Sequence, residues 1–341
     1  MQRNHLTAIA GAVAAVGMLA SAAVQAADPI RWQVQTLWQA GNINQKAFET
    51  FAKNVEVASG GRLIIEALPV GAIVSANEAA DAVRDGLLDG QHSNEGYLAG
   101  KEPAFSVLVD MNMAYESPEQ QIMWFKFGGG EELARELLAK WNQHYLGPVT
   151  WGAESIPSKM PLKSVADFQG IKMRAPEGMG ASIWRKVGVG VSTLPGTEVY
   201  TALERGKIEA TDWGSLAMND DLGYDKIARY AIYPGIHSQP MACGLCIRKD
   251  KWDALPDDLK RIVELAVTQL REDMLLTNRL RDMEAAAKRD PETLVSWSPE
   301  ARAELRGIAR DVWQEWGSRS EMADKIYQSH VAWMKKIGLL Q

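Results

Sequence analysis

The chain has 341 residues, of which 46% are hydrophobic and 23% charged, so it is long enough for about two globular domains and is not globally disordered. A formal net charge of −6 at pH 7 argues against a nucleic-acid-binding surface, and no nucleic acid partner is expected. Two cysteines are too few for a disulfide scaffold or a cysteine-based zinc module.

The first 26 residues have the pattern of a secretory signal peptide. Arg3 gives a basic start, residues 6–23 are apolar or small, and the stretch ends in small residues around Ala26. We expect cleavage after Ala26 and a mature protein in the periplasm. The alternative is a transmembrane anchor, but an anchor needs about 20 strongly apolar residues, and this run is short and rich in Ala and Gly.

The next part of the chain alternates between strand and helix patterns. Strands are predicted over 31–36 and 62–68, and helices over 44–58, 75–85, 118–127 and 131–144. The β-α-β-α order at the start of this part is typical of helices packed on a largely parallel sheet.

A similar order begins again at residue 149. Strands are predicted over 149–152, 171–174, 191–194 and 208–213, and helices over 178–187, 198–205, 256–290, 299–317 and 319–337. The sequence therefore predicts an α/β fold of two lobes with a helical C-terminal region. Ligands of open α/β sheets lie beyond the carboxyl ends of the strands, which places a ligand in a cleft between the lobes.

The sequence offers little for catalysis. It has no G-x-S-x-G, G-x-x-x-x-G-K-[ST] or H-E-x-x-H motif. The histidines after the leader are scattered and are expected to be structural; they are His92, His144, His237 and His330. Cys243 and Cys246 form a C-x-x-C with strand-like flanks, which favours two separately buried thiols, with a disulfide as the alternative. We therefore expect a binding protein, and an exported α/β enzyme that acts on organic acids is the rival class.

Polar and aromatic residues recur where predicted strands end, and these positions are the candidates for a ligand cleft. They are Trp38, Asn94, Tyr97, Trp151, Glu154, Arg174, Asp212 and Trp213. Arg174 is the strongest candidate, because an arginine at the end of a strand offers a planar fork that binds a carboxylate through two hydrogen bonds. The aromatic candidates admit an aromatic acid as well as a small 2-oxo acid.

Several stretches resemble the solute receptors of tripartite ATP-independent periplasmic (TRAP) transporters, in the DctP-like family. The most specific are residues 165–176, which read VADFQGIKMRAP, and residues 196–210, which read GTEVYTALERGKIEA. Residues 100–105, 124–133 and 233–237 add to the resemblance, which covers roughly residues 30–335.

The resemblance implies a periplasmic-binding-protein-like fold with a long helix between the two domains. The domains are expected over 27–149 with 238–278, and over 150–237 with 279–341. The family captures an organic acid by hinge closure and delivers it to a sodium-driven membrane permease. A 2-oxo or 2-hydroxy monocarboxylate is the expected ligand, and an aromatic carboxylate or a dicarboxylate is the alternative.

Particular positions carry the resemblance to the site. Arg174 stands where the family has its carboxylate-binding arginine, and Asp212 with Trp213 matches an acidic-Trp pair of the branch that resembles 2-oxo acid receptors. In that branch a cation bridges to the substrate, so Asp212 and Gln239 are the candidate metal ligands and Glu154 an oxygen donor beside them. Oxygen donors suit Ca²⁺ or Na⁺. No cofactor is otherwise required, and a site based on Arg174 alone is the alternative.

Overall fold

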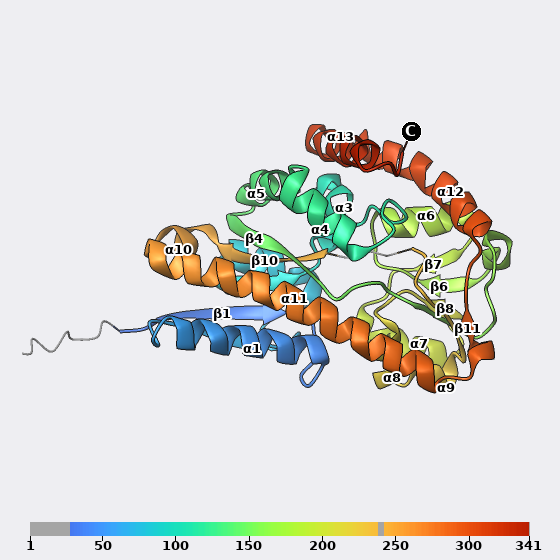
Figure 1. Cartoon of the computed structure of the whole chain (residues 1–341), viewed down its shortest axis with the longest axis horizontal. Coiled ribbons are helices and arrows are strands. Elements are labelled where there is room, and N and C mark those ends of the chain that lie inside the picture. Colours follow the sequence, from blue (N-terminus) through green and yellow to red (C-terminus); the bar gives the residue numbers. More distant parts are fainter. Residues whose placement is uncertain (1–27, 238–241, 341) are drawn as a thin grey trace, which may run out of the picture.

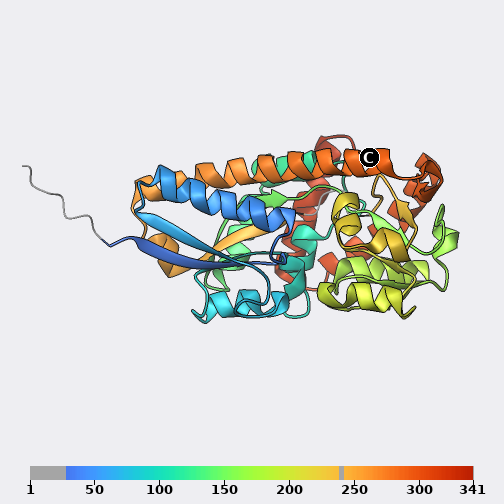
Figure 2. The same ribbon diagram turned by 90° about the horizontal axis from the view of Figure 1, so that it is seen from below.

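The computed structural model describes residues 28–237 and 242–340 (Figure 1). The predicted signal peptide and Gln239 therefore lie outside the described residues. The fold contains two mixed sheets that lie side by side along the long axis, with helices packed around both (Figures 1 and 2). This two-lobed α/β arrangement is the predicted fold class. Within the described residues, no helix has the length and apolar character that a membrane crossing needs.

The first lobe is built on a five-stranded sheet with the order β2-β1-β3-β10-β4. Its strands are β1 (Ile30–Thr36), β2 (Leu63–Leu68), β3 (Gly90–Ser93), β4 (Gln143–Thr150) and β10 (Ala242–Arg248). β1 pairs in parallel with β2 and β3, whereas β10 runs antiparallel to β3 and β4. The helices of this part are α1 (Ile43–Ala58), η1 (Ala76–Glu78), α2 (Ala79–Arg84), η2 (Glu95–Leu98), α3 (Pro103–Val109), α4 (Pro118–Phe127), α5 (Gly130–Ala139) and α10 (Lys249–Asp253).

The second lobe is built on a six-stranded sheet with the order β11-β9-β5-β8-β6-β7. Its strands are β5 (Ile156–Ser158), β6 (Lys172–Arg174), β7 (Gly190–Ser192), β8 (Ala210–Thr211), β9 (Tyr230–Ile232) and β11 (Leu294–Val295). β6 pairs in parallel with β7 and β8, so their carboxyl ends meet at one edge. The helices are η3 (Val165–Phe168), α6 (Met179–Val187), η4 (Gly196–Glu198), α7 (Val199–Glu204), α8 (Leu216–Asp221), α9 (Tyr224–Ile227) and η5 (Pro291–Thr293).

The long helix α11 (Asp257–Lys288) has 32 residues and runs across both lobes (Figures 1 and 2). Asp257 and Asp258 occupy its first turn, where negative charge is favourable to the helix dipole. Its buried residues recur at helical spacing, and they include Leu259, Val263, Val267, Leu270 and Met274. This stripe packs against α1 and β4, and the later turns pack against α8. The predicted helix between the lobes is therefore present.

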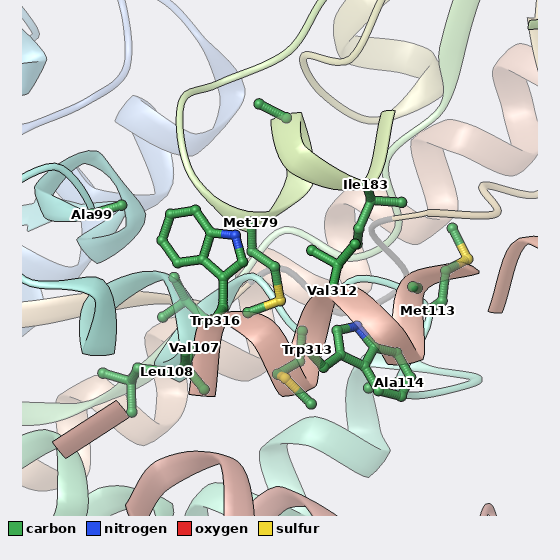
Figure 3. Packing of buried hydrophobic residues seen from close by; sticks show 14 of the residues in the cluster. Ala99, Val107, Leu108, Met113, Ala114, Met179, Ile183, Val312, Trp313 and Trp316 are labelled. Carbon is green, nitrogen blue, oxygen red and sulfur yellow. The ribbon is translucent and has the colours of Figure 1, made fainter. Parts of the chain in front are cut away.

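Two C-terminal helices, α12 (Pro299–Gly317) and α13 (Glu321–Lys336), complete the fold. Trp313 and Trp316 of α12 pack among side chains from α3 and α6, as Figure 3 shows. Their indole N–H groups donate to Asn112 O at 2.9 Å and Ser182 Oγ at 3.1 Å. α12 thus contacts elements on both sides of the predicted domain division, and the assignment of residues 279–341 to the second domain stays a prediction.

Two predicted boundaries are wrong. The helix expected over 131–144 ends at Ala139, and the strand expected over 149–152 begins at Gln143 and ends at Thr150 as β4. Asn142 adopts a left-handed backbone with φ of 55°, which cannot continue a helix. Cys246 lies on β10 as a buried free thiol, in agreement with the strand-like flanks, while the side chain of Cys243 is not among those described. The alternation rule missed β3, because all four of its residues are buried.

Candidate functional site

An outer cavity of about 350 Å³ lies between the two lobes. The first lobe contributes residues from the loop after β1, from the start of η1 and from η2, including Leu37, Asn77 and Tyr97. The second lobe contributes the ends of β6 and β8, with Arg174 and Trp213. The cavity therefore lies where parallel strands end, as the α/β pattern predicts.

A much smaller inner cavity of about 10 Å³ adjoins the same wall. This volume is about what one water molecule needs. Both cavities share Leu37, Tyr97, Arg174, Pro176 and Trp213. The inner cavity adds the buried residues Trp38, Asn94, Trp151, Glu154 and Asp212. All described candidates from the sequence therefore line one or both cavities.

Arg174 is held rigidly at the end of β6 and is only 3% exposed. Its Nε donates to Leu194 O at 3.0 Å, and its Nη1 donates to Asp212 O at 2.6 Å. Nη1 also lies 3.7 Å from Asp212 Oδ1, and the guanidinium lies 5.3 Å from the centre of the Trp213 ring. Within the described residues, Nη2 makes no hydrogen bond, so this corner of the fork is available to a ligand.

Two tryptophans border the inner cavity. The rings of Trp38 and Trp151 meet edge to face, with centroids 4.7 Å apart. Both side chains are buried, yet neither indole N–H has an acceptor among the described residues. Buried donors normally have a partner, and each unpaired one is unfavourable by about 1–3 kcal/mol. A ligand oxygen in this cavity is one way to satisfy them.

Glu154, Asp212 and His237 form a buried cluster beside Arg174, and each is at most 2% exposed. His237 Nε2 lies 3.4 Å from Asp212 Oδ2 and 3.7 Å from Glu154 Oε2. Burial alone lowers the pKa of His237, but the two carboxylates outweigh burial and raise it to about 9. Burial, the largest influence on Glu154, raises the pKa of that carboxyl to about 7.

A close backbone contact brings this cluster together. A Cβ at Gly235 would lie 1.8 Å from the carbonyl oxygen of Glu154, so only glycine lets the segment before His237 run against that loop. Ser155 N donates to Gly214 O at 3.0 Å, which ties the same loop to the end of β8 beside Asp212. His237 was expected to be a structural histidine. Its place at the end of the family-like stretch 233–237 was the one sequence signal for a different role.

The cluster has the donors that a cation needs. Glu154, Asp212 and His237 each offer one ligand atom, and these atoms all lie within 4.8 Å of one another. Glu154 Oε2 and His237 Nε2 are buried and have no hydrogen-bond partner among the described residues. Two hard oxygen donors suit Na⁺ or Ca²⁺, while an imidazole nitrogen is a donor that the predicted set did not contain. The two carboxylates therefore fit a cation, and His237 can join them as a ligand only in its neutral form, because a protonated imidazole nitrogen has no lone pair to donate.

Two further buried acids lie behind the cluster. Glu95 Oε2 accepts a hydrogen bond from Gly244 N at 3.1 Å, and Asp110 Oδ2 accepts one from Ser106 Oγ at 2.8 Å. Burial raises the pKa of Glu95 to about 8 and that of Asp110 to about 7. The negative charges of Asp212 and Glu154 raise the pKa of Asp110 further. The sequence reasoning did not find either residue.

The structure has a cavity between two α/β lobes, one long helix that runs across both lobes, and a buried arginine in the cavity wall, which is an arrangement typical of two-lobed solute-binding proteins. Residues 34–319 match the family described as bacterial extracellular solute-binding protein, family 7 (DctP), and the chain belongs to this family. The family consists of periplasmic receptors that serve transporters and are not enzymes, so the protein is a TRAP solute receptor.

Known proteins are similar to this protein over most of the chain. A monocarboxylate 2-oxoacid-binding periplasmic protein of Nostoc sp. is 29% identical over 93% of this chain and 88% of its own length. A TRAP solute-binding protein from Rhodobacter sphaeroides, solved in an apo open form, is 37% identical, with a TM-score of 0.75, over 91% of this chain and 99% of its own. A TRAP solute-binding protein from Pseudoalteromonas atlantica, solved with bound sodium and pyruvate, has a TM-score of 0.83 and 24% identity over 91% and 95%.

Proposed function

We propose that this receptor binds a 2-oxo or 2-hydroxy monocarboxylate in the cleft between its lobes and delivers it to the membrane subunits of a TRAP transporter. The observation that supports this best is the position of Arg174. Its guanidinium is buried on the wall common to both cavities, and Nη2 has no partner among the described residues. A guanidinium held in this way presents a preoriented donor to a carboxylate.

The inner cavity then receives the polar head of the acid. The carboxylate lies against Arg174, and its oxygens or the oxygen on the second carbon accept hydrogen bonds from Trp38 and Trp151. This arrangement would satisfy the indole donors that lack acceptors. Asn94 and Tyr97 also line the inner cavity and complete the candidate set.

The inner cavity must widen before it takes such a head, because about 10 Å³ holds no more than one water molecule. Residues from both lobes border it, so a rotation that separates the lobes opens it and a reverse rotation encloses the ligand. Enclosure removes water from Arg174 and strengthens its interaction with the carboxylate.

The proposal includes a cation held by Asp212, Glu154 and His237, with Gln239 as a further predicted ligand outside the described residues. When bound, a cation supplies positive charge that chelates oxygens of the acid. Without a cation, Asp212 already helps to orient the carboxylate of the acid, because its backbone oxygen accepts a hydrogen bond from Arg174 Nη1 and so fixes the guanidinium. The similar receptor from Pseudoalteromonas atlantica was solved with bound sodium and pyruvate, and this supports a cation beside the acid in the present chain.

We also propose that the protein is exported and then works with a membrane permease. Residues 1–26 are removed on export, and the mature receptor carries its ligand to the permease in the membrane. A receptor of this family without its permease would bind ligand but give no uptake. Deletion of an adjacent permease gene is therefore expected to abolish uptake of the acid.

Calorimetry with pyruvate tests the binding function. The titration is made in sodium buffer and repeated after exhaustive chelation in sodium-free potassium buffer. We expect binding in the first condition and at least about tenfold weaker binding in the second. Equal affinity in both conditions contradicts the cation and leaves a site based on Arg174. Absence of binding by every 2-oxo and 2-hydroxy acid tested contradicts the proposed function itself.

A further inference from the structure

The outer cavity is much larger than a three-carbon acid requires. Its volume of about 350 Å³ lies within the range of sites for drug-sized ligands, whereas the inner cavity is smaller by more than an order of magnitude. The two cavities share the wall that contains Arg174, so a molecule with its carboxylate at this residue has its other end in the outer cavity. A pyruvate at Arg174 would leave most of that space to water.

The side chains around the outer cavity favour an apolar occupant. Tyr97 and Trp213 offer aromatic surfaces, and Leu37, Pro176, Leu194 and Pro195 add aliphatic surface. Trp213 is partly exposed, so its ring still has apolar area that a ligand can cover. Burial of apolar area is the main source of affinity in such pockets, and each buried methylene group strengthens binding about fourfold.

The charges around the outer cavity oppose a second carboxylate. Among the described residues that line it, the charged ones are Arg174 and Glu177. Glu177 is exposed and forms no ion pair within the described part of the chain. A dicarboxylate with one end at Arg174 would therefore find no second cation in the lining, and Glu177 would repel its free end.

We propose that the receptor selects monocarboxylic acids that carry a bulky apolar or aromatic side chain, and that it discriminates against dicarboxylates. This selection rests on the proposed function, because it assumes that Arg174 holds the carboxylate. It assigns two parts of one site to two parts of the ligand. Arg174 and the inner cavity receive the polar head, and the outer cavity receives the side chain.

Calorimetry with four acids that share the same 2-oxo head tests the selection. The acids are pyruvate, 4-methyl-2-oxopentanoate, phenylpyruvate and 2-oxoglutarate. We expect 4-methyl-2-oxopentanoate and phenylpyruvate to bind at least about tenfold more tightly than pyruvate, since each buries several more apolar carbons. We expect 2-oxoglutarate to bind more weakly than either of the bulky acids.

Two variants locate the selection in the outer cavity. Glu177→Gln removes the repelling charge and is expected to narrow the preference for phenylpyruvate over 2-oxoglutarate about fivefold to tenfold. Glu204→Gln makes the same charge change on the exposed face of α7, outside the cavity lining, and is the matched control. Thr197→Phe, at an exposed lining position, narrows the cavity and should weaken phenylpyruvate more than pyruvate.

The outcomes separate this proposal from the proposed function. Pyruvate binding as tightly as both bulky acids overturns the selection for a side chain and leaves the 2-oxo acid receptor in place. Binding of 2-oxoglutarate as tightly as phenylpyruvate, with no effect of Glu177→Gln, overturns the discrimination against dicarboxylates. If neither the four acids nor their 2-hydroxy counterparts bind, the proposed function fails as well.

Discussion

Asn278 and Asp282 lie one helical turn apart on α11, and they bind opposite lobes. Asn278 Nδ2 donates to Asn44 Oδ1 of α1 at 2.7 Å, whereas Asp282 Oδ1 accepts from Ser215 Oγ at 2.7 Å and from Ala217 N at 2.8 Å at the start of α8. Asn278 and Asp282 are both buried. The long helix is therefore attached to each lobe by neighbouring turns, and a rotation between the lobes must be absorbed around this point.

The first prediction concerns this attachment. Asp282→Ala removes one acceptor from two buried donors, Ser215 Oγ and Ala217 N, and is expected to reduce the free energy of unfolding by about 2–3 kcal/mol. Urea denaturation measures the change. Asp273→Ala on the exposed face of the same helix is the control, and it should change stability by less than about 0.5 kcal/mol. Equal losses in both variants would show that the attachment contributes nothing specific.

The second prediction concerns the ligand carboxylate. Arg174→Ala is expected to weaken binding of the acid at least about thirtyfold, because losing one partner of a buried charge pair is unfavourable by about 2–5 kcal/mol. Arg174→Lys should recover only part of this loss, since an ammonium lacks the planar fork. Calorimetry on folded variants makes the comparison, with the exposed Arg205→Ala as the control for lost charge. Near-normal affinity in Arg174→Ala would remove this residue from the site.

The third prediction concerns the position of the Trp213 ring. A Cβ at Gly196 would lie 2.0 Å from two carbons of that ring, so Gly196→Ala must displace the indole. Trp213 lines both cavities, and we expect the variant to weaken ligand binding about tenfold and to alter the ligand-induced change in intrinsic fluorescence. Gly100→Ala is the matched control, because its Cβ meets nothing within 4 Å. Unchanged binding by Gly196→Ala would mean that the indole does not contact the ligand.

The sequence predicted most of the fold because local signals were strong. The stripe from Leu259 to Met274 indicated α11, and Pro299 marked the start of α12. The failures arose where tertiary contacts decide the structure. β3 is buried on both faces and so shows no alternation. Residues 140–144 contain no glycine or proline to mark the end of the helix, which stops before Asn142 with its left-handed backbone angle.

The candidate site was partly predictable for a similar reason. Arg174, Asp212 and Trp213 come at the ends of strands, and strand ends gather at one edge of a sheet. His237 reaches the same place along a loop with no regular pattern, and Glu95 and Asp110 become notable only through burial. Periodicity does not report such contacts, because it describes each element separately.

The last prediction concerns stability in acid. His330 is fully buried, its ring stacks on Trp124 with centroids 3.5 Å apart, and its Nδ1 lies 2.6 Å from the Tyr115 hydroxyl oxygen. Burial lowers the pKa of His330 from 6.5, the usual value for a histidine, to about 3. The unfolded chain therefore takes up a proton between about pH 6.5 and 3 that the folded chain rejects. The neutral ring's contribution to the free energy of unfolding is therefore fully present above pH 6.5, and it is lost as the pH falls towards 3.

His330→Gln removes this titration. The variant is expected to be less stable than the parent at pH 7, since it loses the ring stacking, but its free energy of unfolding should fall less steeply with acid. The difference in slope amounts to about 1.4 kcal/mol per pH unit between pH 6 and 4, where one proton separates the two states. Urea denaturation at pH 7, 6, 5 and 4 measures it. The raised pKa values of Glu95 and Asp110 act in the opposite direction, but both proteins contain these acids and their effect cancels in the comparison. Parallel stability curves for the two proteins would mean that His330 takes up its proton at the same pH in the folded chain as in the unfolded chain.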